Sequence, residues 1–110
     1  MNYTVNITAA AEHDMANAAD YIEFALKNPS AADHLLDEAD AKLSALSSFP
    51  KQFPLVDDIL LNSWGIHFTQ VKNYLAFYVI SEENHTVTIV RFLYEKSNWR
   101  SILKQGFSLI

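Results

Sequence analysis

Two runs with the periodicity of amphipathic helices meet at the dipeptide Asn28-Pro29. Proline disfavours helical geometry in the residue before it and suits the first position of a new helix, where asparagine is a good N-cap. The dipeptide therefore ends one helix and starts another, which predicts a helical hairpin. The apolar positions at helical spacing are Met15, Ala18, Ala19, Ile22 and Leu26 in the first run, and Ala32, Leu35, Leu36, Ala39, Leu43 and Leu46 in the second. We expect Leu35, Leu36, Leu43 and Leu46 to face a sheet.

Three runs in the second half of the chain, Trp64–Val71, Tyr74–Ser81 and His85–Tyr94, are rich in β-branched and aromatic residues. Such residues favour strands. The first two runs are separated by Lys72-Asn73, a two-residue loop in which asparagine tolerates a positive φ. Together the runs predict an antiparallel meander.

The two ends of the chain complete the pattern. Tyr3–Ile7 alternates with a period of two and predicts a short strand, after which Thr8 can cap the first helix. A last helix is predicted from Ser97 or Asn98 to Lys104. The resulting order, β-α-α-β-β-β-α, predicts an α+β fold in which the helical hairpin packs on a small, mainly antiparallel sheet. The other face of the sheet is expected to be open or partly covered.

The length of 110 residues fits one domain, residues 1–110. The chain has no cysteine, no apolar run long enough for a membrane span and no secretory signal, so we expect a cytoplasmic protein without a membrane partner. Residues 1–58 carry a net charge of −7 and residues 59–110 carry +2. An acidic first half disfavours broad nucleic-acid binding. The four histidines are dispersed, so neither a metal nor another cofactor is expected.

Arg91 is a lone arginine among the apolar residues of the last predicted strand. Two roles remain open for it: contact with a phosphate or partner, or a structural ion pair, for instance with Glu95. Simple alternation places Val87, Ile89, Arg91 and Leu93 on one face, opposite Thr88, Val90, Phe92 and Tyr94.

The segments Val71–Tyr78 and Thr86–Tyr94, with an aromatic residue five positions further on, resemble the RelE/ParE superfamily of type II toxin–antitoxin toxins. Asn28-Pro29 and Leu46–Pro50 resemble the hairpin and its exit in that superfamily, so the resemblance covers nearly the whole chain. It implies a small plasmid-stabilisation toxin that is neutralised in a hetero-oligomer by an antitoxin, whose C-terminal segment wraps around it.

The resemblance leaves two branches open. The RelE-like branch cleaves messenger RNA, usually on the ribosome and without metal, whereas the ParE-like branch poisons DNA gyrase without a recognised catalytic site. RNA cleavage needs a base, cations for the phosphorane and an acid. The candidates are His67 or Lys72 as base, Arg91 and Lys96 as phosphate clamps and Tyr94 as acid.

That catalytic set is incomplete by comparison with relatives. Where relatives often continue Gly-Arg-Arg-Asp-Tyr, this chain has Glu95-Lys96-Ser97-Asn98-Trp99, which loses a cation and replaces a phenol by an indole. The resemblance therefore favours the ParE-like reading, with an RNA-cleaving enzyme or an inactive antitoxin-binding relative as alternatives. The structural alternatives are a solvated strand position for His67 and a simple turn position for Lys72.

The expected contact residues form two groups. The phosphate or target contacts are Arg91, Lys96 and Arg100, and the antitoxin contacts are Leu36, Asp37, Asp40 and Trp99. An antitoxin tail that crosses Asp33, Asp37 and Asp40 should carry lysines or arginines.

Overall fold

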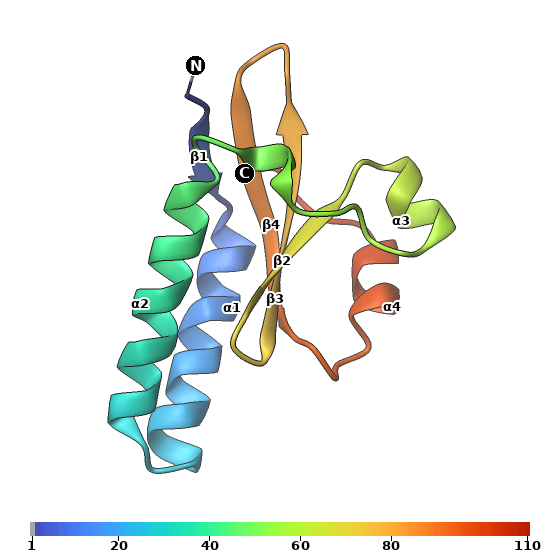
Figure 1. Cartoon of the computed structure of the whole chain (residues 1–110). Helices are drawn as coiled ribbons and strands as arrows, with labels where there is room; N and C mark the ends of the chain where they lie inside the picture. Colours follow the sequence, from blue (N-terminus) through green and yellow to red (C-terminus); the bar gives the residue numbers. More distant parts are fainter. Residues whose placement is uncertain (1) are drawn as a thin grey trace.

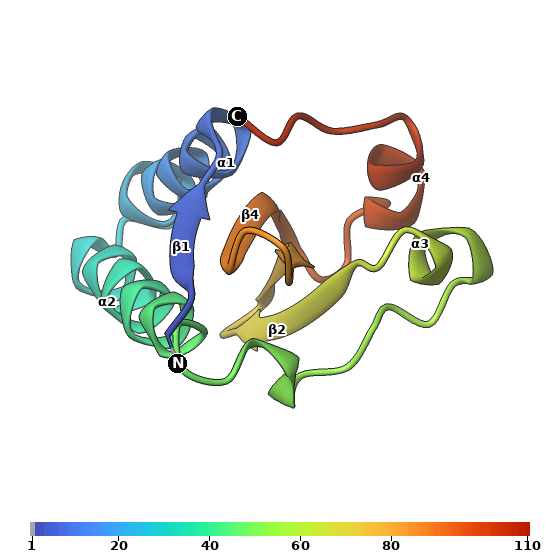
Figure 2. The same ribbon diagram turned by 90° about the horizontal axis from the view of Figure 1, so that it is seen from above.

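The computed structural model describes residues 2–110, which form helices on both sides of a four-stranded sheet (Figures 1 and 2). The strand order is β1-β4-β3-β2, with β1 parallel to β4 and the other neighbours antiparallel. The predicted α+β fold is therefore confirmed. The elements are β1 (Thr4–Ile7), α1 (Ala9–Asp20), the π-helical turn η1 (Tyr21–Ala25), α2 (Pro29–Ala45), the 3-10 turn η2 (Pro50–Gln52), α3 (Ile59–Ser63), β2 (His67–Val71), β3 (Tyr74–Ser81), β4 (Thr86–Tyr94) and α4 (Trp99–Lys104).

Both predicted caps of the hairpin are confirmed. The Thr8 hydroxyl accepts a hydrogen bond from the Ala11 N–H at 3.1 Å. The Asn28 side chain accepts one from the Ala31 N–H at 3.1 Å, and Pro29 occupies the first position of α2. Local side-chain chemistry therefore sets where the helices begin.

The hairpin covers one face of the sheet with the apolar side predicted for α2. Leu35, Leu43 and Leu46 are buried against residues of β3 and β4. Leu36 is the exception, with 37% of its side chain exposed. Successive helical residues point about 100° apart, which places Leu36 just beyond Leu43 at the margin of the buried stripe, where the sheet covers it only in part.

The opposite face of the sheet is covered more fully than the sequence predicts. Figure 2 shows α3 and α4 on the side of the sheet away from the hairpin. A second cluster lies there, in which Val56, Leu61, Ile66 and Leu103 are fully buried. Asp58 starts α3 by accepting hydrogen bonds from the N–H groups of residues 60 and 61. This short helix ends at Ser63 and is followed by a turn at residues 64–65, so the strand predicted from Trp64 begins only at His67.

A β-bulge interrupts the pairing of β3 with β4. Phe77 lies opposite Arg91 while its neighbour Tyr78 lies opposite Ile89, which leaves Val90 as the extra residue. The predicted alternation therefore fails beyond Ile89. Phe92 packs under the hairpin with Val87 and Ile89, whereas Val90 and Leu93 pack on the other side. An extra residue in one strand changes which face the following side chains occupy.

The turn between β2 and β3 also differs in detail from the prediction. Lys72 has a φ of 56°, and Asn73 does not have a positive φ. None of the helices in residues 2–110 has the length and apolar character that crossing a membrane requires.

Candidate functional site

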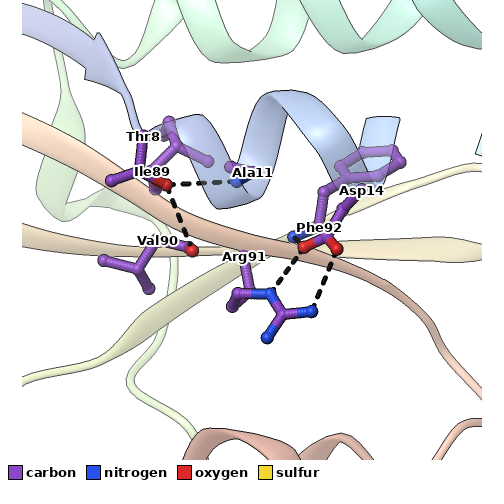
Figure 3. A network of polar contacts seen from close by, with 7 residues as sticks. All are labelled: Thr8, Ala11, Asp14, Ile89, Val90, Arg91 and Phe92. Carbon is purple, nitrogen blue, oxygen red and sulfur yellow. Dashed lines mark hydrogen bonds and ion pairs between the residues drawn. The ribbon is translucent and has the colours of Figure 1, made fainter. Parts of the chain in front are cut away.

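Asp14 of α1 lies beside β4 and binds two of its residues (Figure 3). Its Oδ2 accepts a hydrogen bond from Arg91 Nε at 2.6 Å, and its Oδ1 accepts one from Arg91 Nη2 at 2.9 Å. The same Oδ2 accepts the Phe92 backbone N–H at 3.1 Å. One carboxylate therefore binds both a cation and the edge of a strand.

Thr8 fixes the start of α1 against the same strand (Figure 3). Its backbone N–H donates to the Ile89 carbonyl at 3.1 Å, and its hydroxyl donates to that carbonyl at 2.9 Å. Thr8 is 2% exposed, so these bonds are shielded from water. The contacts hold α1 alongside β4 and direct Asp14 toward Arg91.

The structural ion pair considered for Arg91 is present, but its partner is Asp14, and the pairing with Glu95 is wrong. Glu95 instead accepts a hydrogen bond from Gln70 Nε2 at 2.6 Å. The Asp14 carboxylate raises the pKa of Arg91 above its ordinary value, although partial burial acts in the opposite direction. The charge of Arg91 is therefore compensated within the chain, and two of its nitrogen atoms are already bonded.

A groove of about 820 Å³ lies between the tip of the hairpin and the adjoining ends of β3 and β4. We call it the tip groove, and its walls include Asn17, Tyr21, His34, Tyr74, Tyr94 and Ser97. Tyr74 stacks on Phe92 with ring centroids 5.2 Å apart and meets Tyr94 edge-on at 5.7 Å. Burial and the neighbouring Tyr21 and Tyr94 raise the pKa of Tyr74, which favours a neutral phenol. The groove therefore presents aromatic surface and uncharged polar groups.

Charged residues at the tip groove are paired. Asp14 is bound to Arg91, and Lys72 Nζ lies 3.6 Å from Glu38 Oε2. Lys72 is half exposed, so its ion pair contributes little to stability. The pairs nevertheless leave the groove close to electrical neutrality.

In contrast to the nearly neutral tip groove, the outer side of α2 carries a net negative charge. Asp33, Asp37 and Asp40 follow one another at spacings of four and three residues, which places them on one helix face, and Leu36 lies at the edge of that face. We call this face the acidic stripe. Within residues 2–110 its three carboxylates form no salt bridge, and Leu36 is partly exposed among them. The stripe is thus an unneutralised acidic surface with an apolar residue at its edge.

The candidate bases lie at opposite ends of β2. Lys72 lines the tip groove and follows Val71, the residue of β2 that pairs with Tyr74. His67 lies at the other end of β2, where it pairs with Tyr78. His67 Nδ1 lies 2.8 Å from the Phe53 carbonyl oxygen, and its ring stacks on Tyr78. Of the predicted catalytic residues, the structure brings only Lys72 and Tyr94 to the same groove, where Asp14, the partner of Arg91, also lies.

The remaining predicted contact residues are on the far side of the sheet or beyond it. Trp99 begins α4 and packs on Phe77 of the second cluster, with ring centroids 5.1 Å apart. The Arg100 guanidinium lies over the Trp99 ring at 4.3 Å, and Lys96 is exposed in the preceding loop. Trp99 is therefore separated by the sheet from Leu36, Asp37 and Asp40.

Sequence reasoning missed Asp14, Tyr21 and Tyr74 as parts of a site. Asp14 lies 77 positions before Arg91, and no local pattern relates the two. Tyr74 was assigned to a strand correctly, but its contact with the hairpin tip depends on the tertiary fold. The exposed aromatic residue Tyr21, at the end of an otherwise amphipathic helix, was the available signal.

A helical hairpin on a small mixed sheet, with an acidic outer stripe and an aromatic groove, defines a compact α+β protein whose distinctive surfaces suit contact with another protein. The family model described as "ParE toxin of type II toxin-antitoxin system, parDE" matches residues 5–99. The chain belongs to this ParE toxin family, within the RelE/ParE superfamily. It is therefore the toxin component of a type II toxin–antitoxin system, and an antitoxin neutralises it.

Solved structures agree on the fold. A chain of the chromosomal ParDE toxin–antitoxin system from P. aeruginosa has a TM-score of 0.68 at 14% identity, covering 84% of this chain and 95% of that chain. A chain of the RelBE2 toxin–antitoxin complex from Mycobacterium tuberculosis has a TM-score of 0.58 at 22% identity, covering 86% and 99%. No curated protein sequence shows significant similarity.

Proposed function

We propose that this toxin acts by binding a protein target, DNA gyrase, as the ParE-like branch does, and not by cleaving messenger RNA. The observation that carries the proposal is the bidentate pairing of Arg91 with Asp14. A phosphate clamp must offer its N–H groups to the transition state. Here the Arg91 guanidinium already gives two of its nitrogens to the Asp14 carboxylate, and this nearby anion would repel a phosphate.

The positions of the other candidate catalytic groups support the same proposal. His67 is bonded to a backbone carbonyl and stacked on Tyr78, at the far end of β2 from Lys72. General acid–base catalysis needs its groups within hydrogen-bonding reach of one reacting centre. A base and a cation that lie apart do not form such a centre.

Neutralisation, in this proposal, uses the acidic stripe. Exposed Leu36 offers an apolar contact, and the surrounding carboxylates attract a basic segment of the cognate antitoxin. Because Asp33, Asp37 and Asp40 have no ion-pair partner in the described chain, such a segment displaces no internal salt bridge. The two proteins would form a toxin–antitoxin hetero-oligomer.

Controlled expression tests the proposal in cells. Inducing the wild-type chain alone should arrest growth and trigger the response to DNA damage, and co-expression of the cognate antitoxin should restore growth. Messenger RNA should remain intact at the onset of arrest. Growth arrest accompanied by cleaved, ribosome-bound messenger and undamaged DNA would contradict the proposal. Absence of arrest would instead identify an inactive, antitoxin-binding relative.

A further inference from the structure

The closed end of the helical hairpin carries three large side chains that face water. Tyr21, Phe24 and Leu26 are 58%, 67% and 57% exposed. Figure 1 shows that this end of the hairpin extends beyond the ends of the strands. We call these three residues the tip patch. Exposed apolar and aromatic residues that lie together on a protein surface indicate a contact with another molecule.

The backbone at the tip patch is held in one arrangement by its own hydrogen bonds. The Leu26 N–H donates to the Tyr21 carbonyl, five positions earlier, at 3.1 Å, which makes η1 a π-helical turn. Lys27 has a φ of 55°, and the Asn28 N–H donates to the Ile22 carbonyl at 3.0 Å, which closes the end of the helix. Turns of the π type occur frequently at functional sites. A fixed backbone also lowers the entropy cost of binding.

The π-helical turn interrupts the regular spacing from which Leu26 is predicted to lie on the buried face. Ile22 does pack against the first core cluster, whereas Leu26 is mostly exposed. The packing of the hairpin on the sheet therefore does not explain why the tip carries large apolar side chains. Contact with a partner does explain it.

The tip patch adjoins the surface assigned to the antitoxin. Asp33, the residue of the acidic stripe nearest the tip, lies four positions after Pro29, the first residue of α2, which is about 6 Å along the helix axis. An antitoxin that lies along the acidic stripe therefore reaches the tip patch and excludes another protein from it. A target that binds the tip patch would thus be displaced directly when the toxin is neutralised.

A second group of exposed apolar residues lies on α3 and does not have this relationship. Ile59 is 94% exposed, and Leu60 and Trp64 are also exposed. Figure 2 shows α3 on the side of the sheet away from the hairpin. An antitoxin on the acidic stripe does not cover this group, because the sheet lies between them. Target binding at α3 would leave neutralisation without a steric explanation.

We propose that the tip patch is the surface with which the toxin binds DNA gyrase, and that Phe24 enters an apolar pocket of that enzyme. The inference rests on the proposed gyrase-directed function and names the toxin residues that make the contact. A projecting turn with aromatic side chains suits a concave apolar site on the partner, since buried aromatic anchors supply much of the energy of protein–protein binding. Antitoxin and gyrase then compete for the same end of the hairpin.

Inhibition of gyrase supercoiling by matched variants tests the contact. Phe24→Glu should raise the toxin concentration that gives half-maximal inhibition at least about tenfold, because it places a charge in an apolar pocket. Phe24→Leu, which keeps an apolar side chain, should change that concentration less than about threefold. Ile59→Glu, at the exposed start of α3, is the control and should also stay within about threefold. Circular dichroism and the urea midpoint establish that each variant is folded.

Equal inhibition by wild type and folded Phe24→Glu would overturn the inference and leave the gyrase-directed function intact. Loss of inhibition in Ile59→Glu instead would also overturn it and place the target contact on α3. Self-association of the wild type that Phe24→Glu abolishes, with inhibition unchanged, would assign the tip patch to a second copy of the chain. Absence of inhibition by the wild type would overturn the proposed function and the inference together.

A binding competition tests the overlap of the two surfaces. Immobilised gyrase should retain the free toxin but not the toxin that is already bound to its cognate antitoxin. Free Ile59→Glu should be retained like the wild type, whereas free Phe24→Glu should be retained at least about tenfold more weakly. A stable ternary complex of gyrase, wild-type toxin and antitoxin would overturn the inference.

Discussion

Asp14 and Arg91 form a two-bond ion pair that joins α1 to β4, with Oδ2 2.6 Å from Nε and Oδ1 2.9 Å from Nη2. The same Asp14 oxygen also accepts a hydrogen bond from the Phe92 N–H. Asp14 therefore satisfies a backbone N–H of β4 beyond the residues that pair with β1. The side chains of Asp14 and Arg91 are 12% and 26% exposed, which limits screening by water and salt. The pair is therefore part of the fold as well as a limit on what Arg91 can bind.

Removing Asp14 should destabilise the protein substantially. Asp14→Ala leaves a partly buried guanidinium and a backbone N–H without an acceptor, which should lower the free energy of unfolding by about 2–4 kcal/mol. Urea denaturation measures the loss. His13→Ala, at an exposed neighbouring position, serves as the control and should stay within about 0.5 kcal/mol of wild type. A loss equally small for Asp14→Ala would show that the ion pair does not stabilise the native state.

Substitutions at two leucines of α2 should distinguish an effect on folding stability from an effect on antitoxin binding. Leu43 is 2% exposed, so Leu43→Ala should cost about 2–5 kcal/mol of unfolding free energy. Leu36 is 37% exposed, so Leu36→Ala should cost less than about 1 kcal/mol but weaken antitoxin binding. Denaturation and calorimetric titration measure the two effects. If Leu36→Ala destabilised the fold as much as Leu43→Ala did, the assignment of Leu36 to the acidic stripe would be wrong.

The acidic stripe should accelerate association with a basic antitoxin. Asp37→Lys should slow association about two- to fivefold at low ionic strength, because it weakens the attraction that steers encounter. Salt should reduce the difference, since the screening length is about 8 Å at physiological ionic strength. Asp57→Lys, at an exposed position two residues before α3, is the control. The helix α3 lies on the side of the sheet away from the hairpin (Figure 2). Stopped-flow rates that do not change with salt or with Asp37→Lys would refute electrostatic steering.

Protonation of the Glu82 carboxylate should account for part of the loss of folding stability in acid. Its carboxylate lies 2.9 Å from Lys51 Nζ and accepts the Tyr3 hydroxyl at 2.9 Å, and these contacts, Lys51 first, hold the pKa of Glu82 below its ordinary value of 4.5. The Glu82 carboxylate binds a proton more readily in the unfolded chain than in the folded protein. Its contribution to the free energy of unfolding is therefore complete above the ordinary pKa of the group, and it is lost as the pH falls through the lower pKa of the folded state.

Glu82→Gln isolates that contribution. The variant should lose less stability than wild type between about pH 6 and pH 3, measured by urea midpoints at each pH. Asp58, whose pKa is also lowered, chiefly by Lys104, is unchanged in both proteins and cancels from the comparison. Parallel stability curves for the two proteins would contradict the role given to Glu82.

The features that the sequence predicted well depend on neighbours along the chain. Thr8 and Asn28 cap the helices because their side-chain oxygens reach N–H groups three residues away. The apolar spacing of α2 likewise identified Leu35, Leu43 and Leu46 as buried. Such interactions are encoded locally, so a single sequence suffices to predict them.

The features that it did not predict depend on contacts between distant segments. In Ile89–Leu93, apolar residues are present at both odd and even positions, so alternation does not specify register and the bulge at Val90 leaves no signal. The partner of Arg91 comes from another element rather than from Glu95 four positions away. The tip groove likewise forms only when the hairpin tip reaches the ends of β3 and β4.

DNA supercoiling by purified gyrase, measured with the toxin alone and with its antitoxin, tests the central claim most directly. The account predicts that the toxin inhibits supercoiling, that equimolar antitoxin restores it, and that ribosome-bound messenger in a parallel reaction stays intact. Unimpaired supercoiling at saturating toxin, together with cleavage of the messenger that Arg91→Ala abolishes in a folded variant, would contradict it.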